Sequence, residues 1–190
     1  MRTSLPFGIA ALVLAGCVSN PPAPTPQVEP PVIETPAAGT ALIYFFRPTL
    51  DKTGQGARPS LLVNSGTYAQ LPNSSYTVVQ VPAGMHRFEL KPSDTWESQW
   101  ATAAQFCAVA GKVYFAAVWN QAQPLRHGST VAVLPGGIFI PIPLGPGSTR
   151  GSVVFEVVDP ALGRDSLAGL QRSGPLQTGT VAKSDSSQAC

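Results

Sequence analysis

Charged residues are scarce in this chain: Asp, Glu, Lys and Arg together make up 12% of its 190 residues. Typical soluble domains hold about 25% of these residues. The twelve Lys and Arg nearly balance the ten Asp and Glu, whereas proteins that bind nucleic acid by its phosphates need a surplus of basic side chains. The composition therefore argues against nucleic acid as a partner.

The sequence also lacks catalytic and metal-binding motifs. It has two histidines, His86 and His127, and neither has a close Cys, Asp or Glu at the spacing of metal ligands. Gly-x-Ser-x-Gly nucleophile elbows and Walker-type phosphate loops are absent as well. We therefore expect no metal, no other cofactor and no enzymatic activity. A hydrolase built on His86 and Asp94 is the least favoured interpretation.

The N-terminus has the layout of a secretory leader. Arg2 is the only charge before Cys17, and residues 5–16 form a run of apolar and small side chains that is shorter than the ~20 residues of a spanning helix. Residues 14–17, Leu-Ala-Gly-Cys, end this run and resemble the lipobox of bacterial lipoproteins. The resemblance implies removal of residues 1–16, with a diacylglycerol thioether and usually an N-acyl chain on Cys17. The alternative is an ordinary signal peptide with a chance cysteine near the cut.

Lipidation of Cys17 would fix the location of the protein. Two or three acyl chains hold a protein at a membrane almost irreversibly, whereas a single chain is marginal. In lipoproteins an Asp directly after the lipidated cysteine favours the inner membrane, and the residue here is Val18. In a cell with two membranes we therefore expect the periplasmic face of the outer membrane.

Composition divides the mature chain into three parts. Residues 17–39 carry seven prolines and few bulky apolar side chains, which predicts a polyproline-type spacer that reaches up to ~65 Å. The alternative is a ligand for a proline-reading module. Residues 40–172 contain the apolar runs of one β-rich domain, and we expect residues 173–190 to form a disordered polar tail.

The patterns within residues 40–172 predict an all-β fold, a small antiparallel β-sandwich with a short C-terminal helix. The clearest strand is residues 85–91, which alternate strictly and place His86, Phe88 and Leu90 on one face. Because His86 shares a face with two apolar side chains, we interpret it as a partly buried structural residue rather than as a base or a ligand.

Two connections are predicted from turn and cap residues. Residues 101–109 and 112–120 flank Ala110-Gly111, and we expect them to pair as a tight hairpin. The second of these segments is apolar on both faces, which is typical of a central strand. Asp159-Pro160 combines a good N-cap with a good first helical residue and predicts a short helix, which glycines at positions 163 and 169 should weaken.

Several short motifs occur together within residues 41–171: Ile43-Tyr44-Phe45-Phe46-Arg47-Pro48, Asn73-Ser74-Ser75-Tyr76, Pro82-Ala83-Gly84-Met85-His86, Ala110-Gly111-Lys112-Val113-Tyr114-Phe115 and the short helix after Asp159. In this order they resemble the DUF2846 family of bacterial lipoprotein domains. The Pro-x-Gly turn that leads into an exposed strand is also similar to the PEGA-type β-sandwich. The resemblance implies a small β-sandwich that is usually lipid-anchored, and it brings no known activity or catalytic residues.

Cys107 and Cys190 are the cysteines that remain after Cys17. They can pair in an oxidising compartment, where closing so long a loop would stabilise the fold by ~4.5 kcal/mol. Cys107 lies in an apolar strand-like run, whereas Cys190 ends a polar tail, which favours a buried and inert Cys107. The disulfide is the alternative.

One candidate binding surface lies in an unusual segment, residues 131–144, which is apolar but interrupted by prolines and glycines. An exposed apolar loop of this kind marks a site for a partner or a membrane surface, and Ile138, Phe139 and Ile140 are its central residues. The alternative is a pair of short strands around a Pro-Gly-Gly turn that packs on the core.

A second candidate is an aromatic platform for a small ligand or glycan, formed by Trp96, Trp100 and Tyr76. Asp94 and Glu97 lie near the tryptophans, as paired carboxylates do in glycosidases. Both carboxylates belong to one loop, however, so we interpret that loop as solvated.

These observations predict a lipid-anchored, non-enzymatic envelope protein that binds or supports another envelope component. The expected partners are the membrane, through the lipid on Cys17, and an envelope protein or a peptidoglycan component, through the domain. The alternative is a periplasmic module that binds a small ligand or glycan.

Overall fold

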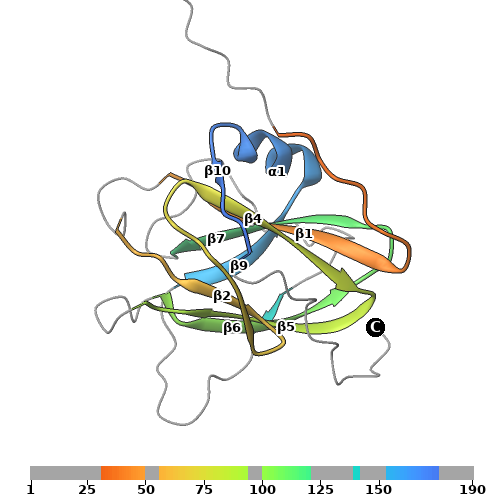
Figure 1. Ribbon diagram of the computed structural model, residues 1–190, viewed down its shortest axis with the longest axis horizontal. Coiled ribbons are helices and arrows are strands. Elements are labelled where there is room, and N and C mark those ends of the chain that lie inside the picture. The colour runs from red at the N-terminus through yellow and green to blue at the C-terminus, as the bar shows by residue number, and fades with distance from the viewer. Residues whose placement is uncertain (1–30, 50–55, 94–99, 121–138, 142–152, 176–190) are drawn as a thin grey trace, which may run out of the picture.

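The computed structural model describes residues 31–49, 56–93, 100–120, 139–141 and 153–175. Within these residues the chain forms two five-stranded sheets and one short helix (Figure 1). An apolar core lies between the two sheets. The predicted all-β sandwich with a short C-terminal helix is therefore confirmed.

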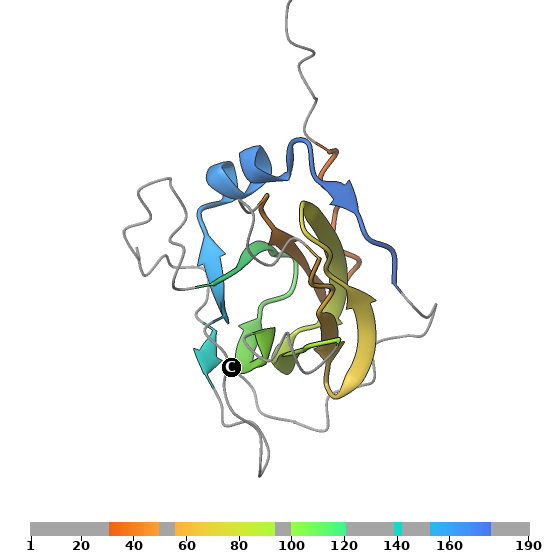
Figure 2. The same cartoon turned by 90° about the vertical axis from the view of Figure 1, so that its left-hand side faces the viewer.

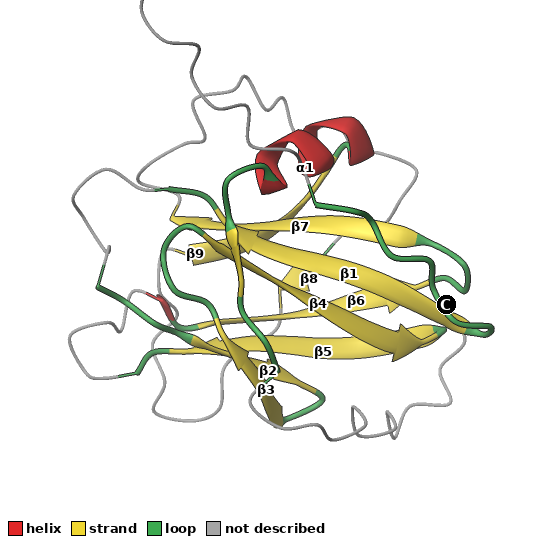
Figure 3. Ribbon diagram, turned by 45° about the horizontal axis from the view of Figure 1, so that its top comes forward, coloured by secondary structure: helices red, strands yellow, loops and turns green. Residues whose placement is uncertain are grey.

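Each sheet combines strands from distant parts of the chain. In spatial order, the strands of the first sheet are β10 (Gln171–Arg172), β4 (Ser75–Pro82), β1 (Thr40–Arg47), β7 (Val113–Asn120) and β9 (Val153–Val158). Those of the second sheet are β3 (Gly66–Gln70), β2 (Ser60–Val63), β5 (Gly84–Lys91), β6 (Thr102–Ala108) and β8 (Ile140–Pro141). The helix α1 (Pro160–Leu167) lies over the first sheet, on the side away from the second (Figure 3).

Most neighbouring strands are antiparallel, but β1 runs parallel to β7, and β4 runs parallel to β10. Parallel neighbours cannot be joined by a tight hairpin and need a long connection. Between β1 and β7 the chain supplies this connection by passing through β4 and four strands of the second sheet. The middle of the first sheet is therefore built from segments that are far apart in the sequence.

The predicted hairpin around Ala110-Gly111 is wrong, although a tight turn is present. Gly111 has a φ of 76° and Lys112 N donates to Val109 O at 3.2 Å. Gly111 N, however, donates to Thr40 O at 2.7 Å, so β7 continues beside β1 while β6 stays with β5. The turn carries the chain from the second sheet to the first because its hydrogen bonds join it to β1.

Five phenylalanine side chains form the centre of the core between the sheets. They come from both sheets and are Phe45, Phe88, Phe106, Phe139 and Phe155. The ring centroids of contacting pairs lie 4.7–5.9 Å apart. Aromatic side chains bury more apolar area than any others, and tilted or offset pairs add favourable ring contacts. This cluster is therefore the main apolar link between the two sheets.

The outer face of the first sheet is apolar as well and is covered by α1. Tyr44 on β1 and Phe115 on β7 stack with their ring centroids 5.3 Å apart, and Leu167 of the helix is fully buried in the same cluster. The predicted helix start is confirmed, since the Asp159 carboxylate accepts a hydrogen bond from Ala161 N at 2.8 Å. The first sheet is thus buried on both faces, as its continuous apolar strands require.

Gly163 has a packing role that its low helix propensity did not suggest. A Cβ atom at this position would overlap the ring of Phe115 and lie 2.8 Å from its Cδ1 atom. Glycine therefore allows α1 to approach the first sheet closely. The cost of a glycine inside a helix is offset by the contact that it permits.

The last part of the predicted spacer, residues 31–39, packs on the domain beside α1 and β10 (Figure 2). Ile33 contacts the apolar cluster under the helix. Glu34 N donates to Tyr44 Oη at 2.8 Å, and the Glu34 carboxylate pairs with Arg172 at 2.7 Å. Residues 31–39 therefore pack with the folded domain, although the sequence predicted them as part of the spacer.

Candidate functional site

The predicted aromatic platform is wrong for two of its three residues. Trp100 is 1% exposed and belongs to the core between the sheets. Tyr76 is 7% exposed and lies in the other apolar cluster, on the outer face of the first sheet, where it stacks on Tyr44. Large aromatic side chains gain most when they are buried, and these two are used for packing on opposite sides of one sheet. They cannot offer a common surface to a ligand.

The residues of the predicted partner surface differ in their exposure. Phe139 is 7% exposed and is part of the phenylalanine cluster, whereas Ile140 is 52% exposed. Successive side chains of a strand point to opposite faces, and β8 pairs with β6 at the edge of the second sheet. Phe139, directly before β8, therefore packs on the core, and Ile140 keeps the exposure that a partner contact needs. The Pro-Gly-Gly turn of the predicted pair of strands lies outside the described residues.

Several predicted residues lie outside the described part of the chain. These are Cys17, Asp94, Trp96, Glu97, His127, Ile138 and Cys190.

Arg47 is a buried charge for which the sequence predicted no individual role. It ends β1 on the same face as Ile43 and Phe45 and is fully buried. Its Nη1 atom donates to Ala57 O at 2.6 Å and to Leu71 O at 3.1 Å. The guanidinium carbon lies 3.9 Å from the ring centroid of Trp100. Strand alternation could have predicted the burial of Arg47, because it places position 47 on the core side.

Through these contacts Arg47 links three connections to β1 at one end of the sandwich. A guanidinium stays charged at every physiological pH, and a buried charge is tolerated only when hydrogen bonds and an aromatic face replace water. Ala57 precedes β2, Leu71 follows β3 and Trp100 precedes β6, so one side chain joins three connections to β1. We assign Arg47 a positioning role, since a guanidinium supplies no proton for catalysis.

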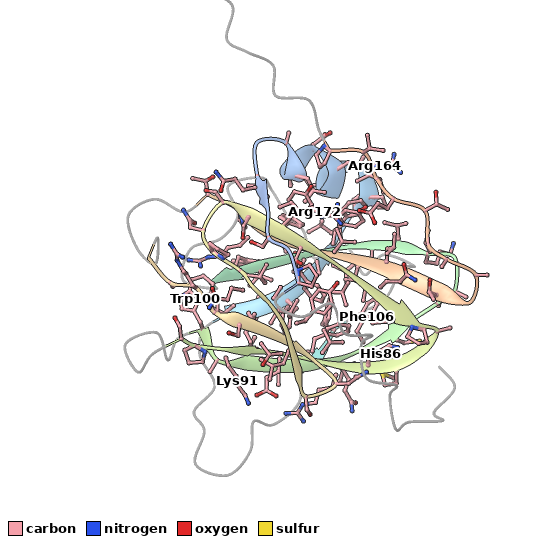
Figure 4. All side chains as sticks on the ribbon, viewed as in Figure 1. His86, Lys91, Trp100, Phe106, Arg164 and Arg172 are labelled. Carbon is pink, nitrogen blue, oxygen red and sulfur yellow. The ribbon has the colours of Figure 1, made fainter. Side chains whose placement is uncertain are left out.

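His86 lies at the other end of the sandwich from Trp100 (Figure 4) and is buried. Its Nε2 atom is 2.8 Å from Pro82 O and its Nδ1 atom is 3.1 Å from Asn64 Nδ2. A neutral ring fits both contacts, because Nε2–H donates to the carbonyl and Nδ1 accepts from the amide. Asn64 Oδ1 in turn accepts from Arg87 N at 3.0 Å. Both ring nitrogens are occupied, which agrees with the interpretation of His86 as structural.

Protonation of His86 should weaken the fold below neutral pH. Burial lowers the pKa of the folded-state imidazole below its usual value, against the smaller opposing effect of the bond to Pro82. The unfolded chain therefore takes up the proton first, so the stabilisation by neutral His86 is complete above about pH 6.5 and is lost as the pH falls toward the lower folded-state pKa. Urea unfolding between pH 5 and 8 measures this slope.

The matched variants are His86→Gln and His127→Gln. We expect His86→Gln to flatten the dependence of the unfolding free energy on pH below about 6.5, and His127→Gln to leave that effect of His86 in place. An unchanged slope in His86→Gln would show that the imidazole does not titrate differently in the folded and unfolded chains.

Cys107 is disulfide-bonded, and the prediction of a buried, inert thiol is wrong. Its neighbours Phe106 and Ala108 face the core, so alternation turns Cys107 to the outer face of the second sheet, where it is half-buried. The apolar composition of this segment did not reveal which residues face the core. The chain has two other cysteines, Cys17 and Cys190.

The outer face of the second sheet carries polar and charged side chains around Cys107. On β5, Arg87 Nη2 lies 3.2 Å and Lys91 Nζ lies 4.0 Å from the carboxylate of Glu89. Gln105 on β6 pairs with Arg87 on one side and with Ile140 on the other. The surface therefore runs from a row of charges to one exposed apolar side chain at the sheet edge.

Two further findings concern only the residues that the structure describes. No three side chains of His, Cys, Asp or Glu come close enough together there to hold a metal ion. None of the helices in those ranges has the length and apolar character to cross a membrane.

Comparison with models of protein families, with curated proteins and with solved structures found no match to this chain. The resemblance to the DUF2846 and PEGA-type domains therefore stays a prediction from the sequence motifs.

Proposed function

We propose that this protein is a lipid-anchored, non-enzymatic component of a bacterial cell envelope, in which the β-sandwich binds or supports another envelope component. The disulfide at Cys107 is the observation that carries the proposal. Disulfides form and persist in oxidising compartments and are rare in the cytosol. This agrees with a leader that exports the chain and with a lipidated Cys17 that holds it at the periplasmic face of the outer membrane.

The position of residues 31–39 supports a particular orientation. The segment lies with α1 on the outer face of the first sheet, whereas the second sheet forms the other layer (Figures 1 and 2). We therefore assign the side of the first sheet to the anchor and the outer face of the second sheet to the partner.

The chemistry of that face fits a protein or a polymer better than the lipid bilayer. It presents the ion-paired row of Arg87, Glu89 and Lys91, with Ile140 exposed at the edge. Charged groups that remain in water at the rim of a contact set orientation and partner choice. The alternative role in binding a small ligand has no support from Trp100 and Tyr76, because both are buried.

The test uses the full chain with a C-terminal tag in intact cells. We expect labelled palmitate to be incorporated and the protein to sediment with outer membranes, and both to be lost in Cys17→Ala. Cross-linking should then capture one envelope component from the anchored protein. An unlabelled protein that stays in the soluble fraction would overturn the anchor.

A matched pair of variants tests the surface. Lys91 lies on the outer face of the second sheet and Arg164 is exposed on α1, in the opposite layer (Figure 4). We expect Lys91→Glu to reduce the cross-linked yield several-fold and Arg164→Glu to leave it unchanged. Equal yields from both variants would overturn the assignment of this face.

A further inference from the structure

Trp119 on β7 and Glu156 on β9 meet on the outer face of the first sheet. Trp119 packs against the apolar cluster under α1 but is only half-buried, and Glu156 is half-buried as well. Trp119 Nε1 donates to Glu156 Oε2 at 2.6 Å, which makes this a short, charge-assisted hydrogen bond. The bond holds the carboxylate at the edge of the indole, so the carboxylate does not cover the face of the ring.

Both side chains keep a capacity for binding that the fold does not use. Among the residues that the structure describes, Trp119 is the one hydrogen-bond or ion-pair partner of Glu156. A carboxylate accepts hydrogen bonds on both oxygens, so Oε1 remains for another donor. In the same residues Trp119 makes no contact with a second aromatic ring. Within these ranges a half-buried carboxylate without a cation therefore lies beside an indole whose exposed part is open to a ligand.

Two hydroxyl groups lie at the same end of the first sheet. β1 lies between β4 and β7 (Figure 3) and is parallel to β7 and antiparallel to β4, so the ends of β1 and β7 lie beside the start of β4. Ser74 directly precedes β4, and Thr49 follows β1. Their hydroxyl oxygens lie 2.8 Å apart in an exposed hydrogen bond. Two strand spacings, about 10 Å, separate β4 from β7, so a short oligosaccharide spans the distance from the indole to these hydroxyl groups.

We propose that this end of the first sheet binds a neutral glycan chain, with one sugar ring stacked on Trp119 and a hydroxyl group of that ring donating to Glu156 Oε1. A pyranose with equatorial hydroxyl groups has faces of C–H groups, which pack on an indole as other apolar groups do. Its hydroxyl groups project from the edge of the sugar ring, where a carboxylate at the edge of the indole meets them. Ser74 and Thr49 supply donors and acceptors for the next sugar unit.

An organic cation is the other class of ligand that an indole and a carboxylate attract. Such ligands are held over the faces of aromatic rings, which often form a cage. Here Trp119 has no second aromatic ring in contact within the described residues, and Glu156 lies at the ring edge. The hydroxyl pair at the same end of the sheet suits a ligand with many hydroxyl groups. These features favour the glycan.

The glycan site is separate from the surface that we assign to the envelope partner. Trp119 and Glu156 belong to the first sheet, whereas the row of Arg87, Glu89 and Lys91 belongs to the second. The inference therefore does not rest on the proposed function. We expect Cys17→Ala to leave glycan binding unchanged while it removes the protein from the membrane.

Calorimetric titration tests the site with the full chain purified in detergent and a tetramer of β-1,4-linked N-acetylglucosamine as the probe. We expect saturable binding. Trp119→Ala should weaken the affinity by about tenfold or more, as loss of a central aromatic contact does. Glu156→Gln should weaken it several-fold, because the amide still accepts from Trp119 Nε1 but replaces Oε1 with a group that donates.

Two further variants keep the test decisive. Val109 is exposed after β6, at the other end of the sandwich, and Val109→Ala should bind the tetramer as the unchanged chain does. The thermal unfolding midpoint of each variant shows whether it is folded. If Trp119→Ala does not fold, Trp119→Phe takes its place. This variant keeps an aromatic ring against the cluster but loses the donor that positions Glu156, and its affinity should fall several-fold.

Three results would overturn the glycan site. The first is the absence of saturable binding to the tetramer. The second is an affinity that stays unchanged in the folded Trp119 and Glu156 variants, which would place binding elsewhere. The third is tighter binding of choline than of the tetramer, lost in Trp119→Ala, which would assign a cation site instead. A Cys17→Ala protein that binds the tetramer but still sediments with membranes would overturn the lipid anchor and leave the glycan site.

Discussion

Replacing Phe139 with Ala is expected to lower the free energy of unfolding by about 3–5 kcal/mol, the range for a buried Phe truncated in a packed core. The ring stacks on Phe106 with a centroid distance of 4.7 Å and on Phe155 at 5.2 Å. It also meets Phe45 and Phe88 from the two sheets. Its removal leaves a cavity where the sheets meet, and urea unfolding at neutral pH measures the loss.

The adjacent residue supplies the control for this experiment. Ile140 is exposed, so Ile140→Ala should change stability by less than about 0.5 kcal/mol. A partner contact through Phe139 would give the opposite pattern, a stable variant that has lost its cross-linked partner. A neutral Phe139→Ala variant would therefore return this residue to the candidate surface.

Replacing Arg47 with Ala is expected to cost about 3–5 kcal/mol of stability, an effect that is large for a polar residue. The variant leaves Ala57 O and Leu71 O without the donor that they now share, and an unsatisfied buried group costs about 1–3 kcal/mol. It also removes the cation from the face of Trp100 and opens a cavity. Arg164→Ala, at an exposed position of α1, should stay within about 0.5 kcal/mol of the unchanged chain.

The role of the cation–π contact can be separated by a double-mutant cycle. If Arg47 and Trp100 stabilise each other, the loss in the double variant Arg47→Ala, Trp100→Phe should be smaller than the sum of the single losses by about 1–2 kcal/mol. Additive losses would mean that the guanidinium stabilises the fold without a contribution from its contact with Trp100.

The features predicted correctly from the sequence are those with local causes. The alternation of residues 85–91 fixes which side chains share a face, and His86, Phe88 and Leu90 are all buried as expected. Asp159 caps α1 because its carboxylate reaches an amide only two residues away. The apolar patterns within residues 40–172 predicted the all-β sandwich. Each of these depends on neighbours along the chain.

The features that the sequence left undecided depend on partners distant along the chain. The turn at Gly111 has the chemistry of a hairpin, but its bond to Thr40 places the following strand in the other sheet. Short apolar and aromatic segments do not show which of their side chains will meet another sheet, so Trp100 and Phe139 were predicted to be available for binding. For the same reason Cys107 seemed buried, although it faces outward.

The sequence by itself therefore determined the class of the fold and the faces of its clearest strand, residues 85–91. The strand periodicities and the cap of the helix are properties of contiguous residues. Only the tertiary structure decided which side chains remain available for function, because burial is settled when two sheets and a helix meet. Trp100, Tyr76 and Phe139 are packed in the apolar clusters, whereas Cys107 and Ile140 face outward.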